Sequence, residues 1–257
     1  MFSKKSGVQP LFFNPKEKEE VSDMRAIELS PRLQTVADLV PSGVRFVDVG
    51  TDHAYLPAAL IQRGVIARAV ASDLRRGPLD RARKTAERYG VTERMSFRLC
   101  DGLSGIKPEE AEYIAIAGMG GETISAILAA APWTKLGDRR LILQPMSALP
   151  ELRSWLQRAG YRIIRERLCR EGRTIYTIML AAPGEMPTLT PAECWAGRQE
   201  SGRQDPLRGE LLADLLRRVE RALAGISHST RPEDIPWRNE LEQVRTGLIE
   251  MQKELEA

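Results

Sequence analysis

The residues with the clearest chemical potential lie in the segment from Asp48 to Pro57, which reads DVGTDHAYLP. It follows a short apolar run, Val44 to Val49, and precedes a segment with helical character. A strand that ends in a glycine turn and opens a helix is typical of nucleotide pockets, because the acidic residue accepts hydrogen bonds and the glycine lets the backbone approach a ligand. We therefore expect Asp48 and Gly50 to bind a cofactor.

The same segment lacks the later glycines that seat a pyrophosphate in dinucleotide-binding proteins. Asp52 and either Ala54 or Tyr55 stand in their places. A carboxylate beside a pyrophosphate would repel it. The segment therefore favours a ligand that has no phosphates and carries positive charge. S-adenosylmethionine, which has a sulfonium and an ammonium group, is the cofactor we expect.

Two further predicted strands end in carboxylates that suit such a cofactor. The second strand ends at Asp73, with Leu74 next to it, and its carboxylate suits ribose hydroxyls. The third strand is followed by Asp101 and Gly102. There the carboxylate can accept from an adenine amino group, and the backbone N–H can serve a ring nitrogen.

The fourth predicted strand ends in a segment with almost no side chains, Ala117-Gly118-Met119-Gly120-Gly121. This glycine-rich loop leaves open space in which a flat acceptor can come close to the sulfonium. All four strand tips are carboxyl ends, which is where open α/β sheets bind ligands. We therefore expect these residues to form one site.

The elements that position this site alternate between apolar and amphipathic segments, which is typical of a parallel sheet with helices on both faces. Ser30 and Pro31 predict the start of a helix before the first strand. The last two strands flank a turn-like segment and should pair antiparallel. Strands are expected near residues 44–49, 67–72, 95–99, 112–117, 139–143, 161–168 and 174–181.

The composition changes after Pro183, where a cluster of helix and strand breakers ends the strand-like runs. We predict an α/β domain over residues 1–185 and an α-helical appendage over residues 186–257. A leucine stripe from Leu207 to Leu223 and a second helix from Trp237 to Leu255 predict an antiparallel hairpin, or coiled coil. The linker between them contains Pro232 and Pro236.

The bulk composition excludes several other classes. The three cysteines are widely separated and form no CxxC pair, so neither a zinc site nor a disulfide framework is expected. No apolar run of about 18 or more residues could span a membrane, and the leader from Met1 to Glu20 has no sustained apolar stretch. We expect a cytoplasmic protein without metal or membrane contact, and a monomer is favoured.

Three segments resemble the bacterial TrmK family: residues 48–57 (DVGTDHAYLP), 115–121 (AIAGMGG) and 141–145 (LILQP). The likeness extends to residues 29–33 (LSPRL) and 161–163 (YRI), so it covers roughly residues 25 to 181. That family comprises S-adenosylmethionine-dependent tRNA (adenine(22)-N1)-methyltransferases. The resemblance implies a Rossmann-like class I methyltransferase domain with a helical coiled-coil appendage, S-adenosylmethionine as cofactor and tRNA as partner.

The chemistry so implied is an in-line methyl transfer from the sulfonium to N1 of adenine, whose lone pair is already free. Asp52 could stabilise the cationic product, His53 and Tyr55 could stack on an extruded base, and Gln144 could read its Watson–Crick edge. The predicted catalytic residues are Asp52, Tyr55 and Gln144. The predicted cofactor-binding residues are Arg32, Asp48, Gly50, His53, Asp73, Leu74, Asp101, Gly102, Ala117 and Gly118.

Other interpretations stay open at this point. The acceptor could be another RNA or a small molecule, or the chain could be a non-catalytic RNA-binding protein with a vestigial pocket. Two arginine-rich groups could contact phosphates or form solvated faces. The first group is Arg75, Arg76, Arg81, Arg83, Lys84 and Arg88, and the second is Arg153, Arg158, Arg162, Arg165, Arg167, Arg170 and Arg173.

Overall fold

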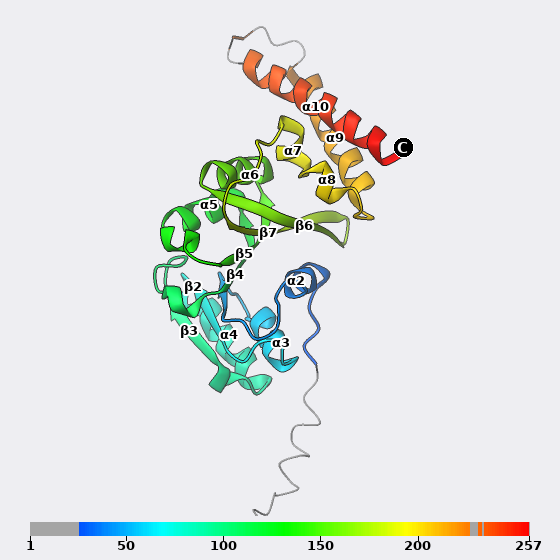
Figure 1. Ribbon diagram of the computed structural model, residues 1–257. Coiled ribbons are helices and arrows are strands. Elements are labelled where there is room, and N and C mark those ends of the chain that lie inside the picture. Colours follow the sequence, from blue (N-terminus) through cyan, green and yellow to red (C-terminus); the bar gives the residue numbers. More distant parts are fainter. Residues whose placement is uncertain (1–25, 227–230, 233, 257) are drawn as a thin grey trace, which may run out of the picture.

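The computed structural model describes residues 26–226, 231–232 and 234–256 (Figure 1). The predicted leader, Met1 to Glu20, lies outside these described residues. Figure 1 shows an α/β body from which two long helices project side by side, α9 (Arg208–Ile226) and α10 (Asp234–Glu256).

A seven-stranded sheet with the order β3-β2-β1-β4-β5-β7-β6 forms the centre of the body. Strands β1 to β5 run parallel, and β7 pairs antiparallel with both β5 and β6. The predicted fold class, with its antiparallel final pair, is therefore confirmed. The strands are β1 Phe46–Val49, β2 Ala69–Asp73, β3 Met95–Leu99, β4 Tyr113–Gly120, β5 Arg140–Ser147, β6 Tyr161–Glu171 and β7 Thr174–Pro183.

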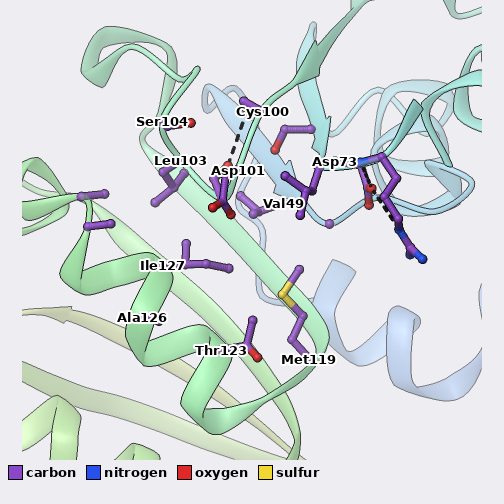
Figure 2. A pocket seen from close by; sticks show the side chains of 17 residues that line it. Val49, Asp73, Cys100, Asp101, Leu103, Ser104, Met119, Thr123, Ala126 and Ile127 are labelled. Carbon is purple, nitrogen blue, oxygen red and sulfur yellow. Dashed lines mark hydrogen bonds and ion pairs between the residues drawn. The ribbon is translucent and has the colours of Figure 1, made fainter. Parts of the chain in front are cut away.

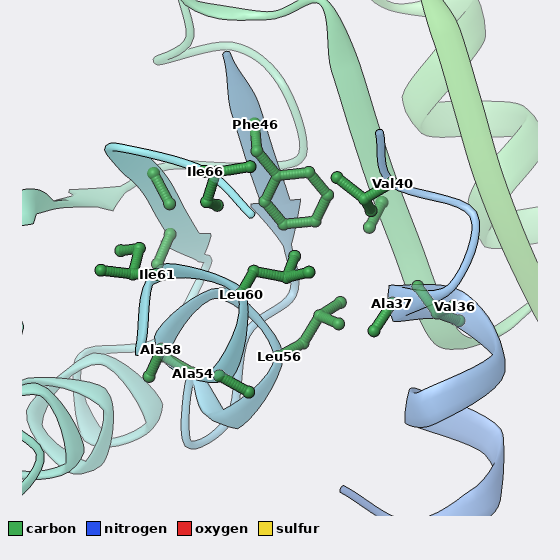
Figure 3. Packing of buried hydrophobic residues seen from close by; sticks show 14 of the residues in the cluster. Val36, Ala37, Val40, Phe46, Ala54, Leu56, Ala58, Leu60, Ile61 and Ile66 are labelled. Carbon is green, nitrogen blue, oxygen red and sulfur yellow. The ribbon is translucent and has the colours of Figure 1, made fainter. Parts of the chain in front are cut away.

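Helices cover both faces of the sheet because successive side chains of each strand point to opposite sides. Phe46 packs in one cluster with residues of α2, α3 and α4, and Figure 3 shows its ring beside Leu60 and Ile66. Val47 and Val49 pack in the opposite cluster with residues of α5 and α6. The helices are α2 Pro31–Ala37, α3 Tyr55–Gln62, α4 Arg76–Arg88, α5 Gly121–Ala129 and α6 Leu149–Arg158, with short 3-10 turns η1 Thr92–Arg94, η2 Pro108–Glu110 and η3 Pro132–Lys135.

Two predicted boundaries at the site are wrong. The glycine-rich segment after Ala117 is not a loop, because β4 continues to Gly120. Strand β5 likewise continues past Gln144 to Ser147. Met119 still pairs with Pro145, although the register shifts between Ala117 and Met119. Gly118, at this shift, has a φ of +79°, a left-handed conformation that glycine adopts readily, and pairing with β5 resumes at Met119 and Gly120.

The chain after the sheet is helical, as predicted. Two short helices, α7 (Pro191–Ala196) and α8 (Gln199–Gly202), lead to α9 and α10. Arg238 near the start of α10 donates to the Ile226 carbonyl at the end of α9 (2.7 Å), and Arg203 donates to the Glu254 carbonyl near the end of α10 (3.1 Å). The two long helices therefore run antiparallel.

One apolar cluster joins the two long helices to α7. Its buried members are Ala192, Ala196, Leu211, Leu212, Leu215, Val219, Leu241, Val244, Leu248 and Met251. Helix α10 begins at Asp234 rather than at the predicted Trp237, and Pro236 lies in its first turn, not in the linker. A proline is tolerated there because first-turn N–H groups have no partner within the helix. The domain boundary after residue 185 stays a prediction.

Two buried arginines, the arginine pair Arg153 and Arg208, anchor the appendage to the sheet. Arg153 on α6 pairs with Glu166 on β6 (2.8 Å) and donates to the Cys194 and Trp195 carbonyls (2.8 and 2.9 Å). Neither of the two interpretations of the second arginine-rich group, phosphate contact or a solvated face, holds for Arg153, because its side chain is fully buried.

Arg208 completes the pair from α9. Its guanidinium donates to the carbonyls of Ala196 and Gly197, the latter at 2.9 Å. Burial lowers the pKa of Arg208, and the neighbouring Glu166 opposes this effect. Both arginines thus bind the last carbonyls of α7, the end of a helix that favours positive charge.

Candidate cofactor and acceptor site

A cavity of about 440 Å³ lies at the carboxyl ends of β1, β2 and β3, against helix α5 (Figure 2). The strand order reverses beside it, between β1 and β4, which is the position where open α/β sheets bind ligands. Five of the predicted cofactor-binding residues line this cavity: Gly50, Asp73, Leu74, Asp101 and Gly102.

The tips of β1 and β2 are fixed to one another by their backbones. The N–H groups of Gly50 and Thr51 both donate to the Ser72 carbonyl, at 2.8 and 2.9 Å. Gly50 has a φ of +76°, and a Cβ added there would lie 2.0 Å from the Met119 methyl carbon. The left-handed conformation of the turn favours glycine, and a Cβ there would displace the flexible end of the Met119 side chain.

Asp73 and Asp101 present carboxylates on neighbouring strand tips. Asp73 is 9% exposed, and its Oδ1 accepts from the Arg75 N–H at 2.7 Å. The Cys100 N–H donates to the Asp73 carbonyl at 3.1 Å, which holds the third strand tip beside the second. Gly102 follows with a φ of +52°, and a Cβ there would meet Ile127 at 3.0 Å.

Asp48 lies behind the cavity rather than in it. It alternates with Val47 and Val49 along β1, and it is buried on the face that carries α3. Burial raises the pKa of Asp48 to about 6, an effect that the Thr51 hydroxyl partly offsets and that the negative charge of Asp73 increases.

Asp52, His53 and Tyr55 form a separate exposed group where α3 begins. Asp52 accepts a hydrogen bond from Arg81, which holds the pKa of the Asp52 carboxyl below its usual range. The His53 and Tyr55 rings stack with their centroids 5.4 Å apart, and Tyr55 is 37% exposed. Asp52 does not cap the helix, because the N-cap is Ala54 in the left-handed conformation.

Arg32 and Gln144 are joined below the tip of β4. The Gln144 side-chain oxygen accepts from Arg32 Nη1 (2.6 Å) and from the Gly118 N–H (3.0 Å). The Gln144 amide nitrogen donates to the Pro145 carbonyl (2.9 Å), and the whole side chain is buried. In this arrangement Gln144 cannot read a base edge, so we revise its role to positioning Gly118 and Arg32.

The predicted site residues are thus not all in one place. Some line the cavity, Asp52, His53 and Tyr55 form the exposed group at the start of α3, and Arg32 and Gln144 form a joined pair below the tip of β4. Arg32, Asp48, His53, Ala117 and Gly118 do not line the cavity. The sequence reasoning missed the wall opposite the strand tips, which carries no chemical signature because its residues are small or apolar. That wall and the remaining lining comprise Val49, Ser72, Arg75, Cys100, Leu103, Ser104, Met119, Thr123, Ala126, Ile127, Ala130 and Ala131.

The lining fits S-adenosylmethionine. Two carboxylates, Asp73 and Asp101, face a cavity whose glycine backbone at Gly50 and Gly102 leaves room that a Cβ would fill. The opposite wall offers apolar surface from residues such as Ile127. A nucleoside with a cationic tail needs this combination of acceptors, close backbone and apolar contact.

Within residues 26–226 and the described residues that follow, no cluster of three or more His, Cys, Asp or Glu side chains could hold a metal ion. No helix in the described part of the chain has the length and apolar character needed to cross a membrane. Cys100, Cys169 and Cys194 form no disulfide among the described residues.

The fold and the cavity together define a Rossmann-like methyltransferase, and residues 29–179 match the family model described as "Methyltransferase domain". A tRNA (adenine(22)-N(1))-methyltransferase of Bacillus subtilis is 39% identical over 162 residues, which are 63% of this chain and 68% of the relative. The chain belongs to the TrmK family of tRNA (adenine(22)-N1)-methyltransferases, as its motifs suggested.

Solved structures agree with this membership. The crystal structure of the B. subtilis TrmK matches with a TM-score of 0.79 and 31% identity, over 88% of this chain and 99% of that one. A Streptococcus pneumoniae relative, described as a tRNA (m1A22) methyltransferase in complex with S-adenosyl-L-methionine, matches with a TM-score of 0.76 and 32% identity. That match covers 88% of this chain and 100% of the relative.

Proposed function

We propose that this protein transfers a methyl group from S-adenosylmethionine to N1 of adenine 22 in tRNA. The observation that carries the proposal is the convergence of Asp73, Asp101 and the Gly50 turn on one cavity, in a chain of the TrmK family. The relative of known structure that holds S-adenosyl-L-methionine supports the choice of cofactor. Because the proposed substrate is a tRNA, we propose that the protein acts in the cytoplasm. We further propose that it acts as a monomer.

In this proposal the cavity residues bind and orient the cofactor. Asp73 accepts from the ribose hydroxyls, Asp101 and the Gly102 N–H serve the adenine ring, and Leu74, 64% exposed, covers its face. When bound, S-adenosylmethionine supplies an electrophilic methyl group. Gly118, held by Gln144, keeps the tip of β4 free of side chains on the acceptor side.

The acceptor needs orientation more than acid–base chemistry, because neutral N1 already has its lone pair. Tyr55, stacked on His53 at the start of α3, can hold the extruded adenine. The Asp52 carboxyl, whose pKa Arg81 holds below its usual range, carries a negative charge that can offset the positive charge of the methylated base. The ion pair with Arg81 reduces this effect, and we therefore expect Asp52 to assist the reaction rather than to be essential for it.

The test is methyl transfer from labelled S-adenosylmethionine to an unmodified tRNA transcript, followed by digestion and chromatography of the nucleosides. We expect label in 1-methyladenosine, and none when adenine 22 of the transcript is replaced by guanine. A protein that binds the cofactor but leaves the tRNA unlabelled would refute the proposed substrate. Label that persists after the replacement would refute the proposed position.

A further inference from the structure

A second cavity, the hairpin groove, separates the sheet from the helical appendage. It has a volume of about 580 Å³ and lies between residues 145–151, which end β5 and begin α6, and the helices α9 and α10. This volume is within the range of about 300–1,000 Å³ that small-molecule sites occupy. Its lining is separate from that of the cofactor cavity, because no residue belongs to both.

The hairpin groove begins next to Gln144, below the tip of β4, where we place the acceptor adenine. Gln144, which holds the Gly118 N–H, donates to the carbonyl of Pro145, the first residue of the groove. Tyr176 also lines the groove, and the Arg32 guanidinium lies 5.6 Å from the centre of its ring. Arg32 in turn donates to Gln144. One end of the groove, at Pro145 and Tyr176, is therefore linked through Gln144 and Arg32 to the tip of β4.

Aromatic side chains are concentrated in this groove. The chain has only four tryptophans, and two of them, Trp195 and Trp237, line it together with Tyr176. Trp237 is 42% exposed and Met146 is 47% exposed, so large apolar surfaces face solvent here. Exposed aromatic rings next to an RNA-modifying site are the surfaces on which single-stranded bases stack.

The charges of the groove are mixed rather than uniformly basic. Arg217 and Arg218 share one carboxylate, Asp214, at 3.1 and 2.6 Å. Glu210 pairs with Arg170 from β6 at 2.7 Å. The remaining charged lining residues are Glu151 and Arg173. The lining therefore has three arginines and three carboxylates, a balance that suits an uncharged base inside the groove and one phosphate at its rim, not a run of phosphates.

From these observations we propose that the hairpin groove binds one unstacked nucleobase of the RNA substrate, from a nucleotide immediately next to the acceptor adenine. The base stacks on Trp237, and Arg173 contacts the phosphate that links the two nucleotides. The inference rests on the proposed function, because it needs an RNA whose acceptor base reaches the tip of β4. The helical appendage then contributes to substrate binding in addition to packing against the sheet.

The first test compares Trp237→Ala with Ile235→Ala. Ile235 lies two residues away on the same helix and is 49% exposed, but it does not line the groove. We expect Trp237→Ala to raise the Kd for tRNA about tenfold, the size of one base–aromatic stack, with the cofactor Kd unchanged. Ile235→Ala should bind like the unaltered protein. Equal tRNA affinities for all three proteins would overturn the inference.

A second test locates the base. Abasic substitution of the nucleotide on either side of the acceptor should weaken binding to the unaltered protein at one of the two positions, and should cost Trp237→Ala nothing further at that position. Additive losses at both positions would contradict a shared contact. If Trp237→Ala does not fold, Arg173→Ala at the exposed β6–β7 turn replaces it, and should weaken tRNA binding and reduce its dependence on salt.

These outcomes distinguish a failure of the inference about the groove from a failure of the proposed function. If the unaltered protein methylates tRNA and Trp237→Ala does so with the same KM, only the inference about the groove fails. If the unaltered protein does not methylate tRNA, the proposed function itself fails. If Trp237→Ala changes the sedimentation of the protein but not its tRNA affinity, the groove is a protein interface and the inference is wrong.

Discussion

The replacement of Arg153 by alanine tests whether this residue supports the fold or contacts RNA. The change removes a guanidinium that is fully buried and leaves Glu166, 11% exposed, without its 2.8 Å partner. The Cys194 and Trp195 carbonyls lose a donor as well. Loss of one partner of a buried ion pair typically costs about 3–5 kcal/mol, because the other charge stays buried.

The cost should fall at the lower end of that range. Arg208 lies close enough to Glu166 for the two charges to interact, so the carboxylate keeps one positive neighbour. We expect Arg153→Ala to lower the free energy of unfolding by about 3 kcal/mol. For a chain of this size, that loss corresponds to a fall in Tm of roughly 10 °C.

The assay is urea unfolding at neutral pH, followed by tryptophan fluorescence. Arg158→Ala is the matched control, because Arg158 lies on the same helix and is exposed. It should change stability by less than about 0.5 kcal/mol. A loss below about 1 kcal/mol for Arg153→Ala, combined with a weaker salt dependence of tRNA binding, would refute the structural role and favour a phosphate contact.

Three further changes test other parts of the structure. Gly197→Ala should destabilise the protein in thermal unfolding, because Gly197 has a φ of +78° and a Cβ there would lie 1.8 Å from Glu166 Oε2. Asp73→Ala should weaken S-adenosylmethionine binding at least tenfold in calorimetry, whereas Asp80→Ala, on exposed helix surface, should not; equal affinities would exclude Asp73 from the cofactor site. Asp48→Asn should stabilise the cofactor-free protein at pH 7.5 but not at pH 4. The pKa of Asp48 is raised from its ordinary value of 3.8 to about 6 in the folded protein. The folded state is therefore most stable, relative to the unfolded state, below pH 3.8, and it loses up to about 3 kcal/mol of stability as the pH rises through 6. A gain that is the same at both pH values would refute that assignment.

The sheet could be predicted from the sequence because its strands are short apolar runs bounded by turns. Their approximate positions, and the antiparallel hairpin at the end, follow from local pattern alone. The continuation of β4 past Ala117 could not be foreseen, since glycines have low strand preference and the pairing of Met119 and Gly120 with β5 forms only in the folded sheet. The start of α10 was placed late because Pro236 was interpreted as part of the linker.

The site was foreseen where a residue type has a chemical meaning of its own. Carboxylates and glycines at strand tips led to Asp73, Asp101 and Gly50, which line the cavity. Burial, in contrast, is a property of the folded chain. Nothing in the sequence distinguishes Arg153, which is fully buried, from the exposed Arg158 five residues later. Likewise, the face of the sheet on which the Asp48 side chain lies is set by the alternation of side chains along β1 in the folded sheet.

The arginine pair has a consequence for how this chain can be divided. A polypeptide that ended at residue 185, the predicted boundary, would leave Arg153 without the Cys194 and Trp195 carbonyls that it contacts. A cut after α7 would instead leave the Ala196 and Gly197 carbonyls without Arg208. We therefore expect the catalytic half and the hairpin to unfold together. Exchange of the hairpin between relatives should succeed only when α6, β6 and α7 are transplanted with it.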